Sequence, residues 1–165
     1  MQHYPLLLYP NPILHKKALA GEGFTQEVHN LISHMQDVMK THNGVGLAAP
    51  QVGISLRLIL VQNGETVEAC MNPQVLSSSK EREVDTEGCL SIPGLWIPIS
   101  RPARISVSYL AKDGKEVTRD LKGFLARVFQ HEIDHINGKL IIDHLGFWER
   151  FKLRKRLKNL GEKSL

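Results

Sequence analysis

The segment that most constrains this chain is Gln130-His131-Glu132-Ile133-Asp134-His135, because it places two histidines four residues apart. On an α-helix, residues i and i+4 lie on the same face, so His131 and His135 can offer two imidazole nitrogens to one metal ion. Glu132 lies about 100° round such a helix from His131, within reach of a water molecule at that ion. This H-E-x-x-H pattern is typical of hydrolytic metal sites in which the glutamate is the general base. A surface helix with two solvated histidines is the alternative interpretation.

The residues before the motif favour a buried helix over residues 124–137. Phe124, Val128, His131 and His135 share one stripe of that helix, so the histidine face continues an apolar face. Two solvated histidines would instead lie on a polar stripe. The pattern therefore predicts a buried ligand pair.

Periodicity and turn residues predict an α+β fold, with antiparallel or mixed sheets packed around this central helix and a further helix towards each end. We expect an extended lead-in over 5–24 with one helical turn near Ile13, a helix over 26–41 capped by Thr25, a loop over 79–85, a basic helix over 147–160, and strands over 56–61, 67–71, 75–78, 105–109, 116–121 and 139–142. No repeat or domain boundary is visible, so residues 1–165 are expected to form a single catalytic domain.

Composition argues against membrane-spanning and disulfide-stabilised classes. The chain is 42% hydrophobic and 23% charged, and no apolar run approaches the length of a membrane span. Its first residues lack the basic stretch of a secretory signal. Two cysteines, Cys70 and Cys89, do not make a disulfide framework. We therefore expect a cytoplasmic protein with no membrane partner, in which Cys70 is a packed free thiol.

A catalytic divalent-metal site needs three protein ligands and an open position, so a third ligand must be found. Zinc peptidases with this motif take it downstream, but Ile141 stands where one class requires histidine, and residues 154–160 lack the glutamate that another class uses. His144 is a remaining downstream candidate. Cys89 is the best upstream candidate, and a thiolate with two imidazoles suits Fe(II), Zn, Ni or Co. A buried structural cysteine and a zinc peptidase stay open as alternatives.

Two further segments can complete a site. Gly44-Val45-Gly46-Leu47-Ala48-Ala49-Pro50-Gln51 permits close approach by a ligand or a neighbouring segment, or forms a tight turn entering a strand. Its Gln51 amide can stabilise an oxyanion without altering the charge of the site. In Glu87-Gly88-Cys89-Leu90-Ser91, the cysteine follows a glycine and can present both its sulfur and the next backbone N–H.

In this order and with these separations, the three segments closely resemble the three motifs of peptide deformylases. The resemblance extends from Tyr9-Pro10-Asn11-Pro12-Ile13-Leu14 to the basic C-terminal helix, and Ile136, where leucine is more frequent, is a conservative departure. It implies N-terminal processing: removal of the formyl group from the formyl-methionine of newly made polypeptides, with release of formate. It also favours Fe(II) as the metal in the cell.

The resemblance implies a role for each site residue. The metal ligands are expected to be Cys89, His131 and His135. The metal lowers the pKa of its bound water, and Glu132 takes that water's proton and delivers it to the leaving amine. The backbone N–H of Leu90 and the side chain of Gln51 meet the developing oxyanion.

The resemblance also implies how the substrate binds. The backbone of Gly46 pairs with the main chain of the peptide, as an added strand would. The methionine side chain is expected in an apolar pocket formed by Val45, Phe124 and Val128.

The net charge of +4 is concentrated at one end of the chain. Residues 149–165 contain seven Lys or Arg against two Glu, so this tail carries +5 and the remainder −1. Docking to the ribosome would explain such a tail, and a solvated amphipathic helix packed on the core is the alternative. A catalytically silent ribosome- or RNA-binding module is a competing function, but Glu132, Cys89 and Gln51 argue against it because binding alone needs none of them. A monomer is the default expectation.

Overall fold

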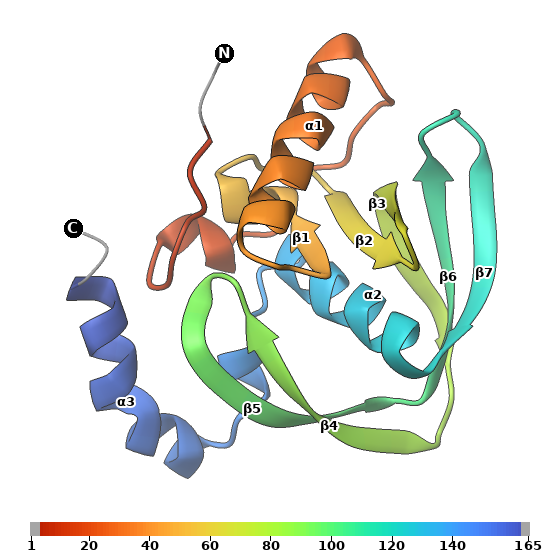
Figure 1. Cartoon of the computed structure of the whole chain (residues 1–165). Helices are drawn as coiled ribbons and strands as arrows, with labels where there is room; N and C mark the ends of the chain where they lie inside the picture. The colour runs from red at the N-terminus through yellow and green to blue at the C-terminus, as the bar shows by residue number, and fades with distance from the viewer. Residues whose placement is uncertain (1–3, 163–165) are drawn as a thin grey trace.

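Helix α2 (Gly123–Ile136), which carries the histidine motif, lies between two antiparallel sheets in the computed structural model (Figure 1). The structure describes residues 4–162, without the side chains of residues 154–156 and 158–162. The first sheet has the order β1-β2-β3-β6-β7, and its strands are β1 (Gly46–Ala48), β2 (Leu58–Asn63), β3 (Thr66–Ser78), β6 (Arg104–Ala111) and β7 (Glu116–Lys122). The second sheet pairs β4 (Arg82–Cys89) with β5 (Ile92–Pro102). The α+β architecture around a central helix is confirmed.

One face of α2 packs on the five-stranded sheet. Phe129, Ile133 and Ile136 are buried there in one cluster with Ile59 of β2 and Val107 of β6. Full burial of a side chain of this size stabilises the fold by about 1.5–3 kcal/mol relative to leaving it in water. The apolar periodicity of the sequence therefore fixes which face of α2 meets the sheet, and leaves the opposite face for the β4–β5 hairpin.

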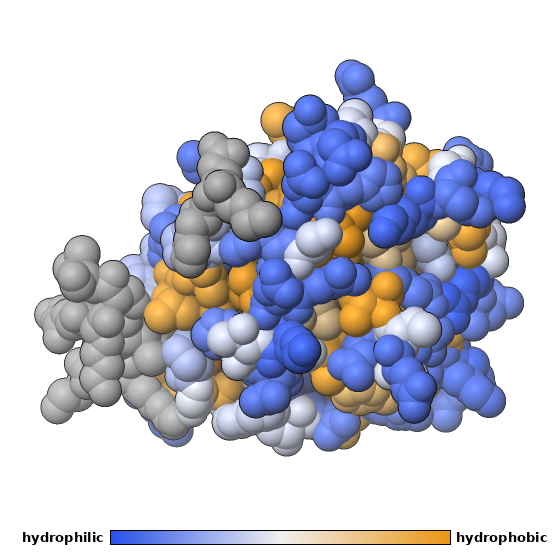
Figure 2. Space-filling view, turned by 45° about the horizontal axis from the view of Figure 1, so that its top comes forward, coloured by the Kyte–Doolittle hydropathy of each residue, from blue (hydrophilic) through white to orange (hydrophobic). Residues whose placement is uncertain are grey.

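Helix α1 (Gln26–Thr41) begins where the sequence predicts it. The Thr25 side chain accepts a hydrogen bond from the backbone N–H of Val28 at 3.4 Å, which satisfies one of the free donors of the first turn. Met35 and Met39 are buried on its inner face against the edge of the sheet. The face of the molecule on which α1 lies is largely hydrophilic (Figure 2), as expected for an amphipathic helix that covers a core.

The sequence predicts separate strands over residues 67–71 and 75–78, and the predicted break between them is wrong. Strand β3 continues through Asn72 and Pro73, and its pairing with β6 shifts register between Met71 and Gln74. Asn72 has φ of 52° there. A β-bulge accommodates an irregular residue without ending the strand, and a proline is tolerated at such a point.

Two further expectations are corrected. Residues 79–85 were expected to form a loop, but β4 begins at Arg82, and β5 was not expected at all. Residues 139–142 form no strand; the apolar run instead enters the 3₁₀-helix η3 (Ile141–His144), with Ile141 and Ile142 buried beside β5. A short apolar run does not distinguish a strand from a buried helical turn, because both need the same burial.

The remaining helices are short or terminal. The 3₁₀-helix η1 (Pro12–His15) provides the helical turn expected near Ile13, and η2 (Ala49–Val52) follows β1. Helix α3 (Phe147–Glu162) runs along the outside of the molecule, and the expected basic helix is confirmed as a helix. Most of its basic side chains lie outside the described residues. No helix within residues 4–162 is long and apolar enough to cross a membrane.

Replacement of Phe129 by alanine should destabilise the fold strongly. The Phe129 ring is fully buried, with its centroid 5.9 Å from that of Tyr109, so its removal leaves a cavity between α2 and the sheet. We expect the free energy of unfolding in urea to fall by about 3–5 kcal/mol. The matched control is Phe147→Ala, because the Phe147 side chain is 74% exposed and its loss should change that free energy by less than about 0.5 kcal/mol. Equal effects of the two substitutions would contradict this description of the core.

Candidate active site

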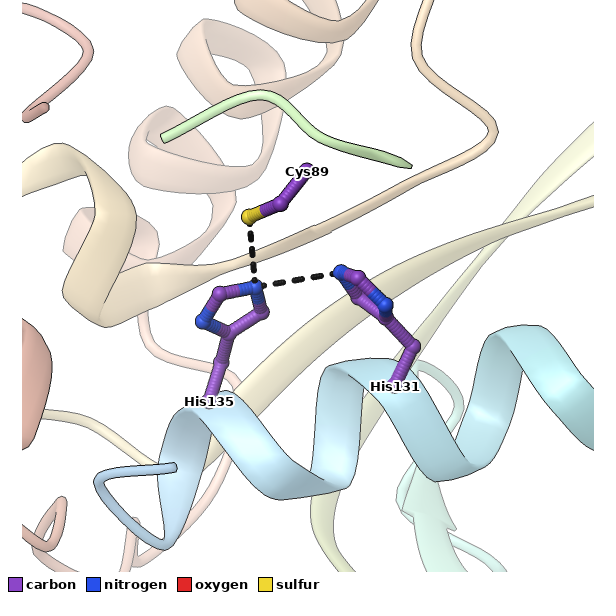
Figure 3. Close-up of side chains that lie close together, drawn as sticks. All are labelled: Cys89, His131 and His135. Atoms are coloured by element: carbon purple, nitrogen blue, oxygen red, sulfur yellow. Dashed lines mark hydrogen bonds between the residues drawn. The ribbon is translucent and has the colours of Figure 1, made fainter. Parts of the chain in front are cut away.

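Cys89, His131 and His135 bring three ligand atoms together between α2 and the β4–β5 hairpin (Figure 3). The Cys89 sulfur lies 3.3 Å from Nε2 of His135, which lies 3.3 Å from Nε2 of His131, and all three atoms fall within 4.8 Å of one another. Donors bound to one tetrahedral ion at about 2.0–2.3 Å would lie about 3.3–3.8 Å apart. The spacing and the chemistry of this cluster therefore fit a divalent transition metal.

Electrostatics in the cluster favour the ligand form of the cysteine. Burial raises the pKa of the Cys89 thiol, but the facing imidazoles of His135 and His131 outweigh this effect and lower it to about 5. Burial lowers the pKa of His131, and its hydrogen bonds with Cys89 and Glu87 raise it well above its usual value. A thiolate is the form of cysteine that binds metals, so the facing imidazoles favour the ligand form of Cys89.

Strand geometry explains why Cys89 points at the helix. Successive residues of a strand face opposite sides, so Glu87 and Cys89 share the face of β4 that meets α2. Pairing with β5 shifts register between Gly88 and Cys89, and the chain then turns through Leu90 and Ser91 into β5. The regular pairing of the two strands therefore ends at Cys89, whose sulfur faces the histidines.

The carboxylate of Glu87 orients His131 from the side of the ring that faces away from the cluster. It accepts a hydrogen bond from Nδ1 of His131 at 2.9 Å, which leaves Nε2 of that ring facing the cluster. It also accepts from Arg101 at 2.6 and 2.9 Å and from Arg127 at 2.7 Å. Burial raises the pKa of Glu87, but the hydrogen bonds from His131 and both arginines lower it far below its usual value. Nδ1 of His135, by contrast, has no hydrogen-bond partner among the described residues.

Sequence reasoning missed this network. The sequence motif that contains Glu87 predicts no role for it, and no sequence pattern predicts a role for Arg127. The available signal was periodicity, since Glu87 is two residues before Cys89 on a strand and Arg127 is four residues before His131 on a helix. Nothing local marks Arg101, which reaches Glu87 because β5 pairs with β4.

His144, the downstream candidate for a third ligand, lies outside the cluster. Its Nε2 is 2.7 Å from Oδ2 of Asp134, and Arg101 donates to the same oxygen at 2.9 Å. Among the described residues, the group able to hold a metal contains Cys89 instead. Asp134 therefore belongs to the ion network around Arg101.

Glu132 lies beside the ligands with a carboxylate oxygen free to act. The side chain is buried, and Oε2 has no hydrogen-bond partner among the described residues. A Cβ atom at Gly46 would lie 2.4 Å from Oε1 of Glu132, so the carboxylate occupies the space that a side chain there would fill. Burial raises the pKa of Glu132, and the two nearby imidazoles only partly offset this effect. Gly46 is thus required for close approach of β1 to α2.

The Gln51 side chain is oriented by the backbone of Ala48, three residues earlier in the chain. Its Oε1 accepts a hydrogen bond from the N–H of Ala48 at 2.9 Å, so the amide nitrogen points the other way. That nitrogen donates to the hydroxyl of Ser91 at 3.1 Å and lies 3.8 Å from the Cys89 sulfur. The 3₁₀-helix η2 therefore presents an N–H donor at the edge of the metal cluster.

A cavity of about 630 Å³ opens in front of these groups. It brings together all the expected substrate residues, which are Val45, Gly46, Phe124 and Val128, with Gln51, Leu90 and Glu132. Val128 is buried, whereas Phe124 and Val45 are exposed at the mouth. Trp96, Ile92 and Leu95 of β5 also line the cavity, and sequence reasoning did not place them there.

Comparison with known proteins is decisive. The sequence matches the family model described as polypeptide deformylase over residues 3–151. The peptide deformylase of Thermotoga neapolitana is 41% identical over 161 residues, 98% of each chain. The crystal structure of a peptide deformylase from Legionella pneumophila gives a TM-score of 0.90 at 36% identity, covering 99% of this chain and 98% of that one. The chain belongs to the polypeptide deformylase family.

Membership of the deformylase family identifies the reaction. Deformylases are metal-dependent hydrolases that remove the N-formyl group from formylated nascent peptides, and this chain is an enzyme of that class. The resemblance carried by the three sequence motifs is thereby confirmed. A zinc peptidase and a catalytically silent binding module are not favoured.

Replacement of Glu87 by glutamine should weaken metal retention. The amide keeps the size of the side chain but removes the charge that Arg101 and Arg127 neutralise and that orients His131. We expect metal affinity, measured by competition with a chelator, to fall about 10- to 100-fold. Glu83→Gln is the matched control, because Glu83 lies on the same strand with an exposed side chain. Unchanged affinity in the Glu87 variant would show that His131 needs no such support.

Proposed function

We propose that Cys89, His131 and His135 hold one divalent metal ion, Fe(II) in the cell, and that Zn, Ni or Co can occupy the same site. The observation that carries this proposal is the set of three donor atoms that lie within 4.8 Å of one another, beside a carboxylate oxygen of Glu132 with no hydrogen-bond partner among the described residues. When bound, such an ion supplies Lewis-acid activation of a water molecule. Metal analysis of protein purified without oxygen, with activity measured per metal, tests the assignment of Fe(II).

Glu132 acts as the general base and then as the general acid. Its unpaired oxygen is positioned to remove a proton from the attacking water. The water oxygen bonds to the formyl carbon, the carbon–nitrogen bond breaks, and Glu132 delivers the proton to the nitrogen of methionine. The remaining proton of the attacking water also passes to the amine, so the products are formate and a protonated N-terminus, and atoms and charges balance without a further reactant.

Two N–H groups stabilise the negative charge that develops on the formyl oxygen. The amide nitrogen of Gln51 is held toward the cluster by the bond from Ala48 to its oxygen, and the backbone N–H of Leu90 follows Cys89 directly. Both donors are neutral, so they favour the oxyanion without competing with the metal for the ligands. Loss of one such donor lowers the rate by about 100-fold or more in comparable sites.

The peptide binds in an extended conformation along β1. This strand pairs with β2 on one side, and on the side of the cavity it pairs with no strand of the described chain. The backbone of Gly46 is therefore free to hydrogen-bond the main chain of the substrate. The methionine side chain enters the apolar part of the cavity between Val45, Phe124 and Val128.

The enzyme works in this proposal as a cytoplasmic monomer on nascent chains, and its basic tail docks on the ribosome. The tail carries +5 over residues 149–165, although most of its side chains lie outside the described residues. Binding through a basic segment weakens steeply as the salt concentration rises, because the release of counterions from the nucleic acid is then less favourable. Cosedimentation with ribosomes that does not change between low and moderate salt would contradict the docking role.

Replacement of Glu132 by alanine tests the proposed chemistry. The variant should bind metal with the same stoichiometry as the original protein, because Glu132 is no ligand in the cluster. We expect hydrolysis of a formyl-Met peptide to fall by at least about 100-fold, since proton transfer of this kind contributes about 10²–10⁴ in rate. The measurements are formate release and metal content in the same sample. An active variant would remove Glu132 from the mechanism, and a metal-free one would leave Glu132 as a structural support of the site.

A further inference from the structure

Trp96 lines the cavity but takes no part in the chemistry proposed above. Its side chain is 69% exposed, which is unusual for the largest apolar residue type on the wall of a binding site. Exposed apolar surface beside a cavity is typical of surfaces that bind a ligand. Packing within the molecule therefore buries only the smaller part of the surface of this side chain.

Strand pairing places the Trp96 ring over β4. Trp96 of β5 lies directly opposite Gly88 of β4, and residues paired in this way project from the same face of the sheet. A Cβ atom at Gly88 would lie 2.9–3.0 Å from three atoms of the Trp96 ring. The ring therefore occupies the side-chain position that Gly88 leaves open, against the backbone of β4 and on the wall of the cavity.

That ring lies on the face of β4 opposite to the metal ligands. Glu87 and Cys89 face α2, so Gly88 between them faces the other way. An extended peptide likewise places successive side chains on opposite faces. With the methionine side chain directed toward Val128 of α2, the next side chain of the peptide is directed to the face that carries Trp96.

We propose that Trp96 is a specificity-determining residue that contacts the side chain of the second residue of the formylated peptide, and that it favours large apolar and aromatic side chains there. The proposal rests on the extended mode of substrate binding described under the proposed function. The indole offers an open aromatic surface above Gly88, and aromatic rings and apolar side chains gain from contact with such a surface. A small polar side chain makes little contact with it.

The test compares formyl-Met-Phe and formyl-Met-Ser peptides of otherwise equal sequence. We expect kcat/KM to be higher for the phenylalanine peptide, and the ratio of the two values to fall about three- to tenfold in Trp96→Ala. Trp96→Phe should keep most of the ratio, because it keeps an aromatic ring. The matched control is Trp148→Ala, since Trp148 is 72% exposed and does not line the cavity, and its ratio should equal that of the original protein.

Each outcome has a separate meaning. An equal loss on both peptides in Trp96→Ala, or no loss on either, overturns the role of Trp96 in specificity while leaving the deformylase chemistry intact. Failure of the original protein to release formate from either peptide would instead overturn the proposed function.

Fluorescence provides a readout that does not depend on turnover. The chain has two tryptophans, so Trp148→Phe leaves Trp96 as the single indole. Combined with Glu132→Ala to prevent hydrolysis, this protein should show a larger change in emission with the formyl-Met-Phe peptide than with the formyl-Met-Ser peptide. Identical spectra with both peptides at saturation would mean that the second side chain does not reach Trp96.

Discussion

The buried carboxylate of Glu87 joins the two elements that carry Cys89 and the two histidines of the cluster. It accepts hydrogen bonds from Arg101 of β5 and from Arg127 and His131 of α2. A buried carboxylate is costly to leave unpaired, and two guanidinium groups offset that cost here. Glu87 and Arg127 are 40 residues apart in sequence, so this network sets the position of the β4–β5 hairpin on the helix. The distance between Cys89 and the histidines depends on it.

The site depends equally on positions without a side chain. At Gly46 the Glu132 carboxylate occupies the space of a Cβ atom, and at Gly88 the Trp96 ring does so. An alanine at either position would push the side chain of Glu132 or of Trp96 aside. Glycine at both positions thus lets a neighbouring side chain pack directly against a strand backbone that lines the cavity.

Elements that pack one face on a core were readable from the sequence. Both α1 and α2 show helical periodicity because each buries a stripe against the five-stranded sheet. Strand β4 was missed because its residues before Glu87 are exposed, so no apolar alternation marks it. Strand β4 is held in place by its pairing with β5, which is a contact between two segments of the chain and leaves no pattern within β4 itself. The apolar residues 139–142 were assigned to the wrong element because burial beside β5 satisfies a 3₁₀-helix as well as a strand.

The sequence by itself determined the chemistry of the site: two histidines and a glutamate at helical spacing, a cysteine after a glycine, and an amide after a run of small residues. Their identities and order were sufficient to indicate the family. Only the tertiary structure decided how Arg101 and Arg127 hold Glu87 behind His131, which side of Gln51 faces the cavity, and that Trp96 covers Gly88. These features arise from contacts between distant segments, and local periodicity carries no information about which distant segments meet.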